Sequence, residues 1–110
     1  MTLEEIAAIK TLSADEHSAL WDAYYGLAPE GDHVSPENRA ALEELIRTAP
    51  SHITRLMPHC NVTEFVGYFP WRRHNGTVGL VSVSVCPDND ACMCDAESSD
   101  LAYFFSTVVA

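Results

Sequence analysis

The sequence predicts an α+β fold, with three to four N-terminal helices packed on one face of a small antiparallel three-stranded β-meander in the order 1-2-3. Two observations support this class. Apolar residues recur at helical spacing before Pro58, whereas β-branched and aromatic residues dominate after it. The dipeptide Asn75-Gly76, between two such β-rich runs, is typical of a hairpin turn. The 110-residue chain is therefore expected to form one domain, helical over residues 1–58 and a sheet over residues 59–110.

Capping residues mark the starts of three predicted helices, and the pairs are Thr2 with Glu5, Ser13 with Glu16, and Ser35 with Pro36. In the first two pairs the hydroxyl accepts from the N3 amide and the glutamate returns to the N-cap amide. In the third pair the proline occupies N1, where an N–H would have no partner. Gly26 and Pro50 should end the second and third helices. Residues 51–57 are expected to form a fourth, short helix that ends at Pro58.

Three runs rich in β-branched and aromatic residues are predicted strands, and they cover residues 62–69, 77–86 and 101–109. If Asn75 and Gly76 are the central residues of a type I′ turn, the first two strands pair antiparallel with His74 opposite Thr77. The third strand should then lie beside the second.

The two faces of this sheet are expected to differ. On the second strand Val81, Val83 and Val85 alternate with serines, so the valine face should lie under the helices. The third predicted strand is apolar on both sides. Its second side should be covered by the first helix, by a homodimer mate or by a target protein, or stay partly open to water.

The net charge is −10 at pH 7, from sixteen acidic and six basic residues. Such a balance disfavours direct binding to nucleic acid phosphates or to an anionic membrane, and it favours a basic protein as partner. The first ten residues carry acids where a secretory signal carries bases, and no apolar run reaches about 18 residues. The expected location is therefore the cytoplasm.

The acidic residues expected to bind a partner lie on the third helix and in a loop over residues 87–100, which holds five acids and no base; they are Glu37, Glu44, Asp88, Asp90, Asp95, Glu97 and Asp100. Fixed carboxylates can take the positions of phosphates in a basic groove. The sequence therefore favours a small acidic protein that inhibits or regulates a basic, nucleic-acid-handling protein, in the manner of viral (phage) and mobile-element antagonists. Three other interpretations stay open: a metal-stabilised (zinc) structural or regulatory module, a subunit of a homo- or hetero-oligomeric assembly, and an acidic surface that serves solubility alone.

Four cysteines are candidate metal ligands, namely Cys60, Cys86, Cys92 and Cys94. With a type I′ turn, Cys60 faces Ala91, which gathers the thiols at the hairpin end away from the turn and offers zinc a tetrahedral set. However, Cys-x5-Cys-x-Cys lacks the Cys-x2-Cys knuckle of zinc modules. Small core and loop cysteines, or a disulfide, are the alternatives, and no cofactor other than zinc is expected.

Sequence motifs for catalysis are absent. The chain has no Gly-rich phosphate loop, no G-x-S-x-G elbow and no H-E-x-x-H. The five histidines are scattered, and carboxylates surround the cysteines, which disfavours a reactive thiolate. The sequence therefore predicts a binding protein and no enzymatic activity.

Overall fold

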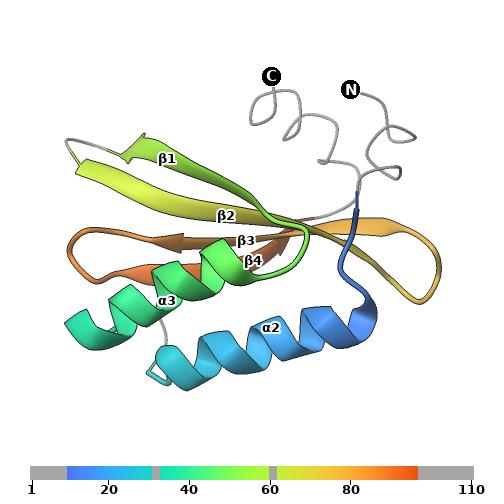
Figure 1. Cartoon of the computed structure of the whole chain (residues 1–110), viewed down its shortest axis with the longest axis horizontal. Helices are drawn as coiled ribbons and strands as arrows, with labels where there is room; N and C mark the ends of the chain where they lie inside the picture. Colours follow the sequence, from blue (N-terminus) through green and yellow to red (C-terminus); the bar gives the residue numbers. More distant parts are fainter. Residues whose placement is uncertain (1–9, 31–32, 60–61, 97–110) are drawn as a thin grey trace.

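The computed structural model describes residues 10–30, 33–59 and 62–96. Its elements are α2 (Ala14–Leu27), α3 (Pro36–Thr48), β1 (Ile53–His59), β2 (Val62–Arg72), β3 (Val78–Val85) and β4 (Ala91–Ala96). The strands form one antiparallel sheet in the order β1-β2-β3-β4, and both helices lie on the same face of it (Figure 1). The α+β class is therefore confirmed, but three to four helices on a three-stranded meander is wrong for the described residues: they form two helices and four strands.

Both described helices begin where the capping residues predicted. The Ser13 hydroxyl accepts from the Glu16 amide at 3.1 Å, and the Ser13 amide donates to the Glu16 carboxylate at 2.9 Å. The Ser35 hydroxyl accepts from the Asn38 amide at 3.2 Å, ahead of proline at N1. The helix predicted from Thr2 and the strand predicted over residues 101–109 lie outside the described residues. Neither α2 nor α3 is long and apolar enough to cross a membrane.

The predicted helix over residues 51–57 is wrong, because this segment forms strand β1. Ser51 takes a positive φ of 58°, which turns the chain after α3, and Ile53 then pairs with Tyr68. β-Branched residues favour the extended backbone that follows. Pro58 is tolerated within β1 because β1 is an edge strand. The sheet therefore begins at residue 53 and not at residue 59.

The acidic loop predicted over residues 87–100 is also wrong in part, since it contains strand β4. Cys86 and Asp90 close a tight turn: the Cys86 amide donates to the Asp90 carbonyl at 2.7 Å, and the Asn89 amide donates to the Cys86 carbonyl at 3.0 Å. Asn89 takes the left-handed conformation, with φ of 69°. β4 then pairs along β3, from Ala91 opposite Val85 onward.

The register of the β2–β3 hairpin differs by one residue from the predicted one. The Arg73 amide donates to the Thr77 carbonyl at 2.9 Å, so the loop has three residues and not two, and Gly76 supplies the positive φ of 87° that such a loop requires. His74 is therefore not opposite Thr77. Because a one-residue shift exchanges the faces of a strand, this loop decides that Phe65 and Phe69 point to the helices.

The core between helices and sheet has the predicted valine face at its centre. Its larger members are Leu20, Tyr24, Leu42, Ile46, Phe65, Phe69, Val81, Val83 and Val85. Gly67 lies next to Ile46 of α3, since a Cβ at this position would overlap with Cγ2 of Ile46. The glycine thus lets the Ile46 side chain pack against the backbone of β2.

Candidate acidic docking surface

Two connections that are distant in sequence meet at one end of the molecule. The Val34 amide, between α2 and α3, donates to the Asn89 carbonyl of the β3–β4 turn at 2.9 Å. His33 forms an antiparallel bridge with Asp90, and its Nδ1 lies 4.0 Å from a carboxylate oxygen of Asp90. Figure 1 shows the start of α3 beside this turn. The backbone itself therefore holds the two connections together.

Arg39 connects the first turns of α3 to the β3–β4 turn. Its Nε donates to the Cys86 carbonyl at 3.1 Å, and its guanidinium pairs with Glu43, four residues along the helix, at 3.2 Å. Glu43 therefore neutralises the charge of Arg39 within α3, and the hydrogen bond to Cys86 holds α3 against the β3–β4 turn.

The result is a group of exposed carboxylates, which we call the acidic end; its residues are Glu37, Asp88 and Asp90. Among the described residues, no basic side chain forms an ion pair with Glu37 or Asp88. The nearest arginine along α3 after Arg39 is Arg47, whose guanidinium stacks 4.9 Å from the centre of the Phe65 ring. The acidic end therefore presents negative charge on a fixed backbone.

A polar hollow of about 260 Å³ adjoins the acidic end, lined by Glu64, Ser84, Cys86, Asp90, Ala91 and Cys92. The Cys86 thiol donates to a Glu64 carboxylate oxygen at 3.0 Å. This hydrogen bond, with burial and the charges of Glu64, Asp88 and Asp90, raises the pKa of Cys86 to about 12. Cys86 is therefore a neutral thiol at physiological pH, unlike a nucleophilic or metal-bound cysteine.

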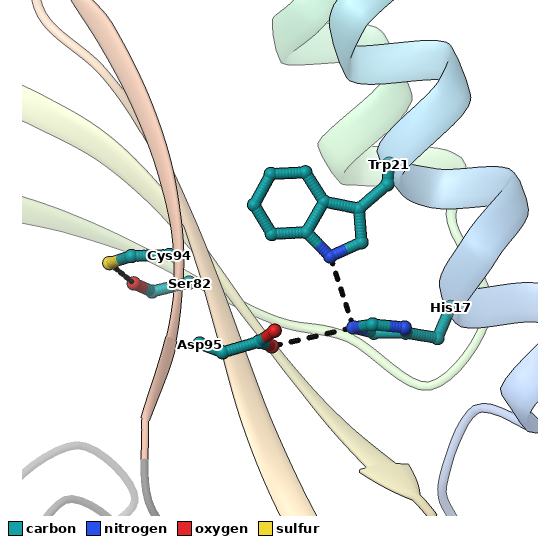
Figure 2. Close-up of polar contacts among 5 residues, drawn as sticks. All are labelled: His17, Trp21, Ser82, Cys94 and Asp95. Atoms are coloured by element: carbon teal, nitrogen blue, oxygen red, sulfur yellow. Dashed lines mark hydrogen bonds and ion pairs between the residues drawn. The ribbon is translucent and has the colours of Figure 1, made fainter.

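Cys92 and Cys94 lie on β4, and Cys86 lies in the turn before it. Ala91 pairs with Val85 of β3, and Cys60, which was predicted to face Ala91, lies outside the described residues. Cys92 lies opposite Ser84, and Cys94 lies opposite Ser82 with Sγ 3.2 Å from the serine oxygen (Figure 2). Partial loss of solvation is the main cause that raises the pKa of Cys92.

Within residues 10–30, 33–59 and 62–96, no group of three or more histidine, cysteine or acidic side chains is arranged to hold a metal ion. Cys60 lies outside these ranges. The complete four-cysteine zinc site therefore stays a prediction.

The predicted partner-binding acids fall into three groups. Glu37, Asp88 and Asp90 come together at the acidic end. Glu44 is exposed further along α3, and Asp95 lies on β4 beside α2. Glu97 and Asp100 lie outside the described residues.

An aromatic cluster around His17 was not predicted as a unit. The His17 ring stacks on Trp71, with centroids 3.6 Å apart and planes at 8°. The Trp21 indole N–H donates to Nε2 of His17 at 3.1 Å, and the same Nε2 lies 3.4 Å from an Asp95 oxygen (Figure 2). The i,i+4 spacing of His17 and Trp21 is the only sequence signal for it, because Trp71 and Asp95 arrive from distant strands.

The geometry at Nε2 explains how this cluster joins α2 to the sheet. The ring of His17 stacks on Trp71 of β2, and its Nε2 lies within reach of both Trp21 of α2 and Asp95 of β4. The cluster is thus a structural contact that fixes α2 on the sheet.

No family model matches this chain, and no curated protein and no solved structure matches it either.

Proposed function

We propose that this protein is a small binding module that docks through its acidic end on a cationic groove of a nucleic-acid-handling protein and thereby regulates or inhibits it. One observation carries the proposal: the backbone pairing of Val34 with Asn89 and of His33 with Asp90 holds Glu37, Asp88 and Asp90 on one rigid end. Carboxylates carried on a backbone that is ordered before binding cost less ordering entropy on association. Proteins that hold nucleic acid present clustered lysines and arginines, which match such a surface.

The distribution of charge along the sheet supports this orientation. Arg72 and Arg73 lie at the β2–β3 hairpin tip, whereas Asp88 and Asp90 lie at the opposite end of β3. An eight-residue strand separates the two ends by roughly 26 Å. This exceeds the Debye length of about 8 Å at physiological ionic strength, so the tip does not neutralise the acidic end.

A competition experiment tests the proposal. Tagged wild-type protein should capture a partner from its host extract, and duplex DNA or RNA should displace that partner if the carboxylates occupy phosphate positions. The variant Glu37→Gln/Asp88→Asn/Asp90→Asn should fail to capture it. A matched variant, Asp15→Asn/Asp22→Asn/Glu44→Gln, removes three exposed carboxylates from the helices and should capture it normally.

Two results would overturn the proposal. Capture that is unaffected by the acidic-end variant would remove the acidic end from recognition. Equal loss with both variants would mean that net charge alone, without a docking surface, accounts for binding.

A further inference from the structure

The sheet face that points away from α2 and α3 carries a pair of thiols on strand β4. Cys92 and Cys94 are two positions apart on this strand, so both side chains leave its backbone on the same side. Figure 2 shows Cys94 directed away from α2, whereas Asp95, the next residue, points toward His17. Both thiols are exposed. A small ion can therefore reach the two sulfur atoms from solvent.

Polar contacts with strand β3 arrange the two thiols as a pair. Cys92 lies opposite Ser84, and Cys94 lies opposite Ser82, whose hydroxyl oxygen is 3.2 Å from Sγ of Cys94. The Cys92 thiol is within hydrogen-bonding reach of both Ser84 and Cys94. The four side chains thus form a polar ladder on two paired strands, and the backbone register holds the two sulfur atoms next to each other.

We propose that Cys92 and Cys94 bind one monovalent copper ion between their two sulfur atoms. Each thiol releases its proton to solvent and forms one Cu–S bond; the ion is taken up as Cu(I), so no electron is transferred. Soft thiolate sulfur selects Cu(I), which accepts two thiolates in a linear arrangement. Zinc prefers four ligands, and within residues 10–30, 33–59 and 62–96 no set of three histidine, cysteine or acidic side chains is placed to hold a metal ion.

A disulfide between the same two cysteines fits the strand less well. Two steps along an extended strand separate the Cα atoms by roughly 6.7 Å, and disulfides rarely exceed about 6.8 Å. Two Cu–S bonds in line span more than one S–S bond, so a copper ion bridges the sulfur atoms without distorting β4. Cys86 is a poorer ligand, because its thiol donates to a Glu64 carboxylate oxygen at 3.0 Å.

Titration with Cu(I) under reducing conditions, against a chromogenic copper chelator, tests the site with two variants that each keep two of the four cysteines. Cys60→Ser/Cys86→Ser retains the proposed pair and should bind one Cu(I) with a sulfur-to-copper charge-transfer absorption in the ultraviolet. Cys92→Ser/Cys94→Ser should bind Cu(I) more than about 100-fold more weakly, which exceeds the usual effect of a change outside the ligands. Circular dichroism checks that both variants fold.

The affinity for copper should also rise with pH, because the ion displaces protons from the thiols. Partial loss of solvation raises the pKa of Cys92 above 9.0, so this thiol is protonated at neutral pH. From about pH 6 to about pH 8, the affinity of Cys60→Ser/Cys86→Ser for Cu(I) should therefore rise at least about tenfold per pH unit.

Three results would overturn the proposal. The first is equal affinity of the two cysteine variants for Cu(I). The second is zinc binding by Cys60→Ser/Cys86→Ser in preference to copper. The third is loss of copper binding in the acidic-end variant, which keeps all four cysteines, because this would assign the ion to the carboxylates. Partner capture is measured separately, so failure of the copper site and failure of the acidic end are distinguishable.

Discussion

The contact between Cys86 and Glu64 makes the native state sensitive to alkaline pH. The pKa of Cys86 is raised from 9.0 to about 12, chiefly because its thiol donates to the Glu64 carboxylate. An unfolded chain loses this proton first, so native stability falls as the pH rises from about 9 to about 12. The variant Glu64→Gln should lower the Cys86 pKa and flatten this decline, measured by urea unfolding at a series of pH values.

Asp22→Asn is the matched control for this measurement, because Asp22 is an exposed carboxylate on α2. Its stability should decline with pH as the wild type does, which controls for the loss of one exposed negative charge. A decline that is the same in Glu64→Gln and wild type would show that the thiol does not depend on Glu64.

Gly67 leaves room for the side chain of Ile46 on the backbone of β2. Gly67→Ala places a Cβ in overlap with Cγ2 of Ile46 and close to the Phe69 ring, and relief of this overlap requires these side chains or α3 to shift. We expect a loss of about 1–3 kcal/mol in the free energy of unfolding, measured by chemical denaturation. Gly26→Ala is the control, since no atom lies within 4 Å of its new Cβ; within a helix it should stabilise by up to about 1 kcal/mol. Equal effects at both glycines would contradict this packing.

At the scale of elements, the β3–β4 turn connects folding to the acidic end. Asn89 holds a φ of 69°, which costs a β-branched residue about 1–2 kcal/mol. Asn89→Val should therefore destabilise the protein by this amount and weaken binding to a short oligo-lysine peptide, because Asp88 and Asp90 lose their positions. Asn89→Gly permits the same φ and should retain both properties. Urea unfolding measures the change in stability, and calorimetric titration measures the binding of the peptide. Full binding by Asn89→Val would show that recognition does not depend on the conformation of this turn.

Elements with local signals were predictable from the sequence, and elements that depend on neighbours were not. Ser13 and Ser35 mark their helices by hydrogen bonds within one turn. β1 carries no such signal. As an edge strand away from the helices it leaves Leu56 65% exposed, which blurs the alternation expected of a strand. Ser51 to Pro58 consequently resembled a short helix between two prolines.

β4 was missed for a related reason. It has six residues, with cysteines at alternate positions in place of the β-branched residues that mark β2 and β3. The turn before it uses Pro87 and Asn89, without the Asn-Gly pair that identified the other hairpin. Burial of Ala91 and packing of Met93 against the core fix its register, and both depend on tertiary contacts.

At the scale of the whole molecule, the acidic end depends both on residues that are neighbours in the sequence and on residues that are far apart in it. Asp88 and Asp90 share one turn, so their proximity could be predicted from the sequence. Glu37 joins them only because Val34 pairs with Asn89, a contact between residues 55 positions apart in the chain. Asp95 lies in the same acidic stretch of sequence, but β4 carries it toward His17 and away from the acidic end. No linear pattern distinguishes these outcomes.

Basic and acidic residues lie at opposite ends of β3, so two variants can test whether binding depends on the position of the charges or on the net charge of the molecule. Arg72→Gln/Arg73→Gln makes the molecule more negative at the hairpin tip, while Glu37→Gln/Asp88→Asn/Asp90→Asn makes it less negative at the acidic end. If recognition is local, the tip variant should bind the oligo-lysine peptide as the wild type does. The acidic-end variant should bind about tenfold more weakly, since three exposed pairs contribute about 0.5 kcal/mol each. Titration from low to high salt should reduce the affinity of the wild type more steeply than that of the acidic-end variant, which carries three fewer negative charges. Tighter binding by the tip variant, in proportion to its added charge, would mean that total charge determines association and that the acidic end has no special role.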